Sequence, residues 1–153
     1  MVNYTDKPQL AQDLNETNDC FVRALAISAK ISYNEAHGIA EELFGRKTGE
    51  GTTGVQSTVM SETGKEYFER RRIALEPVNH TYVRRDKKVH NLNVRGFYNR
   101  FGKGTYLILV PNHALAIVDG VIQDWTAATK HIGRKVEAAF RVTNGRQLEL
   151  FNC

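Results

Sequence analysis

The stretch Asn18-Asp19-Cys20-Phe21-Val22-Arg23-Ala24-Leu25-Ala26 decides the expected fold, because it begins an amphipathic helix with a cysteine. Apolar residues recur at the spacing of one buried helical face, which predicts a helix from residue 18 to about 30. The polar residues before Cys20 are able to cap this helix. Free N–H groups and the positive end of the helix dipole favour a thiolate at this position. Cys20 is therefore a candidate nucleophile, which still needs a base and an oxyanion site from elsewhere.

The composition indicates a single soluble domain over residues 1–153, with 41% hydrophobic and 25% charged residues. No apolar run approaches the roughly 20 residues that a membrane-spanning helix needs. The first fourteen residues lack the apolar core of a signal peptide. We therefore expect a cytoplasmic protein, in which the reducing environment keeps Cys20 and Cys153 unpaired.

Helical patterns fill the first half of the chain, after an irregular arm over residues 1–17. A second helix is predicted from 32 to 44, with a capping box formed by Ser32 and Glu35 and a stop at Gly45. A third is predicted from 55 to 72, weakened by Gly64. The glycine-rich loop between them, residues 49–54, lacks the Lys-Ser/Thr ending of a phosphate-binding loop.

Extended patterns fill the second half, with one short helix at 93–101. Residues 73–83 read as extended, and Pro77 places part of this segment at a sheet edge. Further strands are predicted at 105–110, 113–119, 121–125 and 138–143. The pair Asp119-Gly120 predicts a tight hairpin between two of them. Helices followed by an antiparallel sheet make the predicted fold class α+β.

Two residues of the predicted hairpin could complete a site with Cys20. His113 begins one strand and Asp124 lies near the end of the next, roughly opposite across the turn and within cross-strand reach. A carboxylate there would fix the tautomer of the imidazole and stabilise its charged form, and Trp125 could shield the contact from water. A lone histidine among apolar neighbours is more often a core residue, so the hypothesis depends on the combination.

This combination resembles a known family. Asn18-Asp19-Cys20 leading into an apolar helix, together with the run from Gly104 to Asp124 that contains His113-Ala114-Leu115-Ala116-Ile117-Val118, is similar to small papain-like cysteine peptidases. The likeness is greatest to the compact single-domain forms of bacteriophages and bacteria, and it covers residues 15 to 125. It implies an α+β papain-like fold, with N-terminal helices packed on a C-terminal antiparallel sheet. A phage-encoded member would act in the host cytoplasm.

The resemblance also assigns roles to residues. It makes Cys20 the nucleophile, His113 the general base and then the general acid, and Asp124 the group that orients His113. The family has a glutamine six residues before the cysteine, where this chain has Leu14. Asn15, Asn18 and the more distant Gln12 are the available substitutes as oxyanion donors. Asn15 is preferred because its amide can donate as glutamine does, with the Cys20 N–H as a second donor.

The expected activity is hydrolysis of a peptide or isopeptide bond in a protein or peptide substrate, through a thioester on Cys20 and without a cofactor. Deamidation and transamidation use the same thioester and stay open. No metal site is expected, because His80, His90 and His131 lack the spacing of zinc ligands. The loop from Gly45 to Gly54 and the stretch near Lys87 are expected to form the walls of the cleft.

A basic segment supports an alternative of another class. Residues 65–105 contain 11 basic and 4 acidic side chains, interleaved with aromatic residues, whereas residues 1–64 are net acidic. A catalytically silent papain-like module could bind nucleic acid or an acidic protein through this segment. Equally, the charges could be an ordinary solvated face. A third possibility is a structural protein in which Cys20 is simply buried.

Overall fold

The structure is a computed structural model that describes residues 9–124 and 131–146. The predictions for residues 1–8, Trp125 and Cys153 lie outside these ranges. Among the described residues, no helix is both long enough and apolar enough to cross a membrane.

Helices form most of the first half of the described chain, as predicted. In order they are α1 (Gln9–Asp13), α2 (Cys20–Ala29), α3 (Tyr33–Phe44), α4 (Val55–Met60) and α5 (Glu62–Arg70), with α6 (Val94–Arg100) in the second half. The expectation of a wholly irregular arm was wrong, since α1 lies within it. Ser32 caps α3 by accepting a hydrogen bond from the Glu35 N–H, and Gly45 ends it in the left-handed conformation.

The helix predicted over 55–72 is two helices. Ser61 separates them, because its extended backbone ends α4 while its hydroxyl caps α5 by accepting from the Gly64 N–H. Gly64 packs so closely on the preceding turn that an added Cβ would collide with the Thr58 carbonyl oxygen. The glycine therefore allows a tight corner between two helices, where the sequence suggested only a weak point in one.

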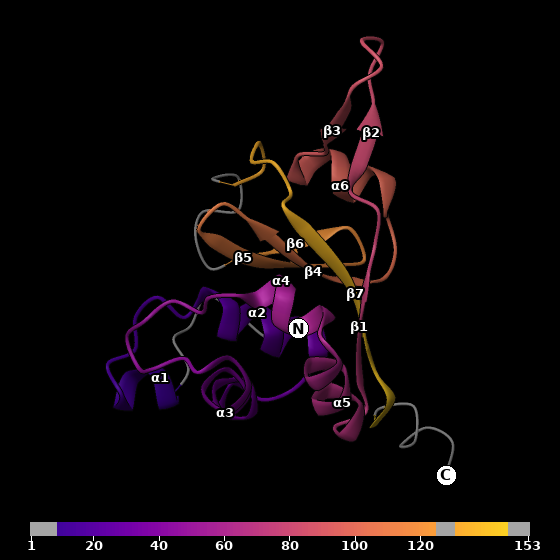
Figure 1. Cartoon of the computed structure of the whole chain (residues 1–153). Coiled ribbons are helices and arrows are strands. Elements are labelled where there is room, and N and C mark those ends of the chain that lie inside the picture. Colours follow the sequence, from indigo (N-terminus) through magenta and orange to yellow (C-terminus); the bar gives the residue numbers. More distant parts are fainter. Residues whose placement is uncertain (1–8, 125–130, 147–153) are drawn as a thin grey trace.

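The second half of the chain forms an antiparallel sheet and a separate hairpin (Figure 1). The five-stranded sheet has the order β1-β7-β4-β5-β6, and β2 pairs only with β3. Their bounds are β1 (Ile73–Pro77), β2 (Thr81–Val83), β3 (Val89–Asn91), β4 (Thr105–Val110), β5 (His113–Val118), β6 (Val121–Gln123) and β7 (Ala138–Asn144). Pro77 lies on edge strand β1, and the two-residue Asp119-Gly120 turn has positive φ at both residues, as a tight hairpin requires. The predicted α+β class is confirmed.

Both faces of the sheet are buried, as the alternating directions of the side chains along β4 show. Leu107 belongs to the core shared with α2, α3 and α5, whereas Tyr106 and Ile108 belong to the core shared with α6. Because successive side chains of a strand point to opposite faces, one apolar strand serves both cores. Helices α2 to α5 accordingly lie on one side of the sheet and α6 on the other (Figure 1).

Helix α2 is the element that connects the helical layer to the sheet. Phe21, Val22 and Leu25 are almost fully buried, and α2 packs directly on β5. Asp19 precedes the helix but does not cap it, since its carboxylate binds Arg23 and the Tyr33 hydroxyl. These contacts tie the first turn of α2 to α3.

Candidate active site

Cys20 and His113 meet where the first turn of α2 crosses the beginning of β5. The thiol is hydrogen-bonded to the His113 side chain, and the backbone N–H groups of Ala114 and Phe21 also donate to it. Cys20 is the first residue of its helix and His113 the first of its strand. The contact therefore depends on the packing of two regular elements, with no flexible loop involved.

Asp124 holds the other side of the imidazole. The Nε2 atom of His113 lies 3.1 Å from each carboxylate oxygen of Asp124, and the two side chains are only 9% and 1% exposed. The β5–β6 pairing ends at Ala116 and Gln123, so Asp124 lies one step further and diagonal to His113. Because Nε2 faces the carboxylate, Nδ1 is the ring nitrogen left for the Cys20 sulfur. The structure thus brings the three residues together in the order Cys20, His113, Asp124.

The pKa values favour an ion pair at Cys20 and His113. Burial by itself raises the pKa of the Cys20 thiol, but the hydrogen bonds from His113 and from backbone N–H groups outweigh it, and the net pKa is lowered. Burial lowers the pKa of His113, yet the hydrogen bonds to Asp124 and Cys20 raise it to about 9. Both shifts favour a thiolate beside an imidazolium, and the thiolate is the reactive form of a cysteine.

His131 also belongs to this site, a position that no local pattern in the sequence predicted. Its ring stacks on that of His113, with centroids 4.1 Å apart and planes inclined by 23°, and it is buried. Donor atoms of His113, Asp124 and His131 all lie within 4.8 Å of one another, a set that zinc could accept. Within this group the His113 ring is hydrogen-bonded to the Asp124 carboxylate, an arrangement that suits acid–base chemistry.

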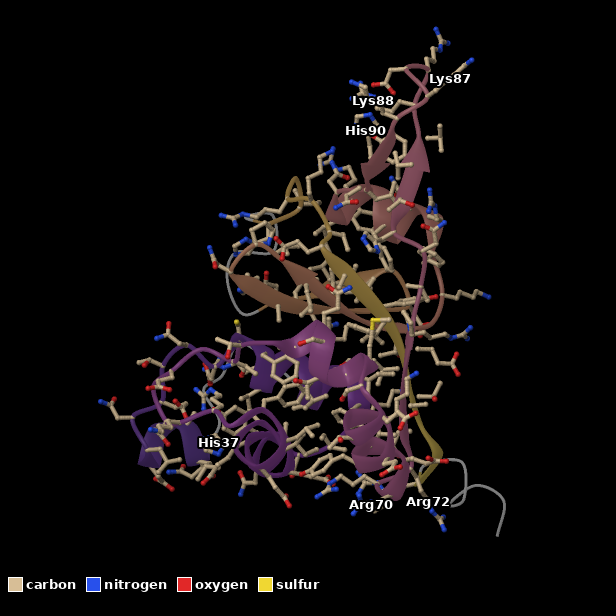
Figure 2. The ribbon with its side chains drawn as sticks, in the orientation of Figure 1. His37, Arg70, Arg72, Lys87, Lys88 and His90 are labelled. Atoms are coloured by element: carbon tan, nitrogen blue, oxygen red, sulfur yellow. The ribbon has the colours of Figure 1, made fainter. Side chains whose placement is uncertain are left out.

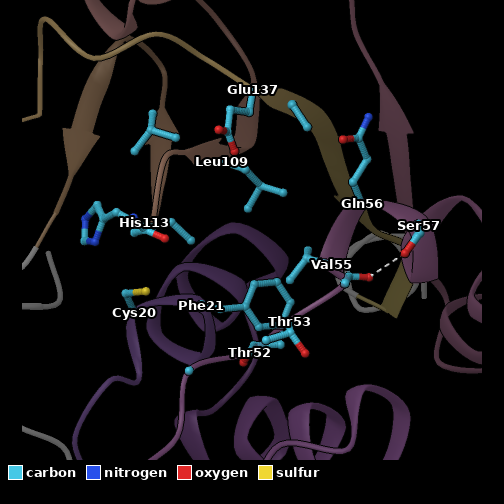
Figure 3. A pocket seen from close by; sticks show the side chains of 16 residues that line it. Cys20, Phe21, Thr52, Thr53, Val55, Gln56, Ser57, Leu109, His113 and Glu137 are labelled. Carbon is cyan, nitrogen blue, oxygen red and sulfur yellow. Dashed lines mark hydrogen bonds between the residues drawn. The ribbon is translucent and has the colours of Figure 1, made fainter.

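A pocket of about 590 Å³ opens beside the Cys20 sulfur (Figure 3). One wall is the loop from Gly51 to Gly54, as expected, and the opposite wall is the sheet at Leu109 and Glu137. Cys20 and His113 lie at one end of the pocket, and Gln56 lies at the other (Figure 3). The stretch near Lys87, also expected to line the cleft, lies on the projecting hairpin and takes no part in the described lining.

A buried ion pair holds the loop that leads into Cys20. Glu16 is almost fully buried and accepts hydrogen bonds from both terminal nitrogens of Arg46 at 3.0 and 2.7 Å. It also contacts His37 Nε2 at 2.7 Å and the Gly49 N–H at 2.6 Å. Burial alone raises the pKa of Glu16, but these hydrogen bonds lower it to about 2. Glu16 therefore links the approach to Cys20 with the loop that forms one wall of the pocket.

The two asparagines predicted as oxyanion donors do not reach the described pocket. The Asn18 amide donates to the Gly49 carbonyl oxygen at 3.0 Å, so it fastens the two loops together. Asn15 has a left-handed backbone with φ of 50° and does not appear among the described lining residues. Asn112 does line the pocket, directly before His113. The oxyanion role of Asn15 and Asn18 stays a prediction.

Comparisons of the chain with protein-family models, with curated proteins and with solved structures gave no match.

The buried charge of Glu16 gives a testable dependence of stability on pH. Replacing Glu16 by Gln leaves Arg46 buried without its counter-charge, which should cost about 3–5 kcal/mol of unfolding free energy at pH 7. The folded-state pKa of about 2 lies below the ordinary 4.5, so the contribution of Glu16 is present above pH 4.5 and is lost as the pH falls toward 2. The difference between wild type and E16Q should therefore shrink over this window.

Urea unfolding at a series of pH values measures this difference. Glu50→Gln, an exposed position near the same loop, is the matched control and should change stability by less than about 0.5 kcal/mol. An E16Q protein as stable as wild type at pH 7 would contradict the structural role of the pair.

Proposed function

We propose that this protein is a papain-like cysteine hydrolase or acyl transferase that acts on a peptide or isopeptide bond. The observation that supports it best is the hydrogen-bonded series from Cys20 through His113 to Asp124 at the end of a pocket. The helix-borne cysteine packed across an antiparallel sheet is also the arrangement that the sequence resemblance implies.

The first half of the reaction would form a thioester. The Cys20 thiolate attacks the carbonyl carbon, and the electron pair of the C=O bond moves onto oxygen. The Cys20 N–H, at the first turn of α2, would donate to this oxyanion. His113 then gives its proton to the leaving amine, the C–N bond breaks, and the acyl group remains on Cys20.

The second half would return the enzyme to its starting state. Neutral His113 takes a proton from water as the water oxygen attacks the thioester carbon, and the C–S bond breaks to release a carboxylic acid. Asp124 keeps the imidazole oriented and stabilises its charged form in both halves. An amine in place of water would give transamidation, and a side-chain amide as substrate would give deamidation.

The reactivity of Cys20 tests this proposal. In a Cys153→Ser background, the rate of alkylation by iodoacetamide should rise with a midpoint below the ordinary thiol pKa of about 8.5. In His113→Ala the partner is lost while burial remains, so the midpoint should move to or above the ordinary value. Alkylation at pH 7 should then slow about tenfold or more. Asp124→Asn should give an intermediate profile, because it removes only the group that raises the pKa of His113.

His90→Ala is the matched control, since His90 lies on the distant hairpin, and its profile should follow wild type. Peptide hydrolysis should disappear in Cys20→Ala and fall by about 10²- to 10⁴-fold in His113→Ala. A Cys20 that reacts slowly, with a midpoint that ignores His113, would contradict the proposal and favour a structural role for the cysteine.

A second candidate function rests on the hairpin β2–β3, which projects from the body of the protein (Figures 1 and 2). The basic segment 65–105 is not one surface, because Arg70 and Arg72 lie at the end of the molecule opposite Lys87 and Lys88 (Figure 2). The hairpin tip alone concentrates four exposed cations, which are Arg84, Arg85, Lys87 and Lys88.

The one acidic residue of the tip is engaged within the hairpin. Asp86 accepts from the Lys88 N–H at 2.8 Å and contacts His90 Nε2 at 3.2 Å. Arg100 holds the base of the hairpin by donating to the carbonyl oxygens of Asn79 and Thr81. A narrow two-stranded ribbon with a cationic tip suits a groove of double-stranded DNA, where phosphates provide the counter-charge.

Binding of a short fluorescein-labelled DNA duplex, followed by anisotropy at several salt concentrations, tests this second function. Neutralising Arg85, Lys87 and Lys88 to Gln should weaken binding and reduce the salt slope by about 2 to 3, one for each lost phosphate contact. The control R70Q/K47Q/K65Q removes equal charge from exposed sites elsewhere and should bind like wild type, as should Cys20→Ala. Equal weakening in both triple variants, or no binding by wild type, would contradict it.

A further inference from the structure

The pocket beside Cys20 has one strongly charged side chain apart from the catalytic pair. Among its described lining residues, Glu137 is the only carboxylate, and none is lysine or arginine. Glu137 lies on the sheet wall next to Leu109, between the end of the pocket at His113 and the end at Gln56 (Figure 3). This local acidic site stands out in a chain with a net charge of +4.

The position of Glu137 is fixed by the sheet. Its N–H donates to the Leu109 carbonyl oxygen at 2.8 Å, and the next residue, Ala138, begins β7. The side chain is exposed to solvent at the pocket rim, and among residues 9–124 and 131–146 its carboxylate forms no hydrogen bond or ion pair. The backbone of Glu137 is therefore fixed beside the cleft, and its carboxylate is open to a ligand.

Between Glu137 and Cys20 the pocket is apolar. Phe21, Val55, Leu109 and Ala138 contribute hydrocarbon surface to its lining. Threonine, serine and glutamine side chains, from the loop and from α4, add neutral hydrogen-bonding groups at the rim. A ligand group that fits this sequence of surfaces has an apolar stem and a cationic end, as the side chains of lysine and arginine do.

We propose that the pocket selects a lysine or arginine side chain next to the bond that Cys20 attacks, with the stem against Leu109 and Phe21 and the cation at Glu137. This specificity rests on the proposed acyl-transfer function, which supplies the reacting bond. A glutamate or aspartate at the same substrate position would meet Glu137 with like charge and would be excluded.

Dipeptidyl chloromethyl ketones test the specificity without requiring turnover. In these probes the Cys20 thiolate displaces chloride and forms a thioether, so inactivation reports binding beside the sulfur. The set carries lysine, norleucine or glutamate at the first or second residue from the ketone. Norleucine has the stem of lysine without the ammonium group, so it isolates the contribution of the charge.

At one of the two positions, the lysyl probe should inactivate Cys153→Ser protein about fivefold faster than the norleucyl probe, and the glutamyl probe should be slowest. Added salt should reduce the preference, because the rim is exposed. Glu137→Gln should abolish it and Glu137→Lys should reverse it toward glutamate. Glu41→Gln, an equal change of charge at an exposed position on α3, should leave it intact.

Iodoacetamide separates failure of this specificity from failure of the proposed function, because it is small and neutral. Rapid alkylation of all Glu137 variants, together with no preference for lysine at either position, would overturn the specificity and leave the function standing. A preference that persists in Glu137→Gln would also overturn it. Slow alkylation throughout would instead count against the thiolate at Cys20, and with it against both proposals.

Discussion

The packing of α2 on β5 is the constraint on which the rest of the site depends. Phe21, Val22 and Leu25 bury one face of the helix, and each fully buried side chain of this size contributes about 1.5–3 kcal/mol. The same contact sets the Cys20 sulfur beside the His113 ring, because each residue begins its own element. The apolar core thus determines the chemistry at its edge, and a shift of α2 by one residue would separate thiol from imidazole.

Each charged side chain near this contact is stabilised by the charged side chain next to it. Burial disfavours a thiolate at Cys20, and His113 together with backbone N–H groups offsets this effect. Burial also disfavours a charged His113, and Asp124 together with Cys20 offsets that. The same holds for Glu16 and Arg46 at the loop before Cys20. Each is buried, and each is stabilised in its charged form by the opposite charge of the other. Each charged group is stabilised by the opposite charge beside it. Removal of one group therefore also affects groups that it does not contact.

The elements that the sequence predicted best are those that a local pattern specifies. The Asp119-Gly120 turn, the Ser32 cap and the apolar strands β4 and β5 follow from spacing and turn chemistry, and the hairpin placed Asp124 within reach of His113. Other features depend on contacts between distant segments. His131 lies after β6 in the chain but stacks on His113, and Arg46 pairs with Glu16 from another loop. Glu137 lines the pocket because β7, which follows it, pairs with β4. No local sequence pattern predicts these contacts. The corner at Gly64 could not be predicted either, because in the sequence it looks like a weak point in one helix.

The ionisation of His113 is the property to measure first, because it depends on the Cys20 thiolate and the Asp124 carboxylate together. An NMR titration of the His113 ring, assigned by comparison with His113→Ala, measures it in the intact protein. We expect an imidazolium that persists through neutral pH and titrates with a pKa of about 9, and a lower pKa in Asp124→Asn. A ring that titrates near its ordinary value of about 6.5 in both proteins would contradict the ion pair and the function built on it.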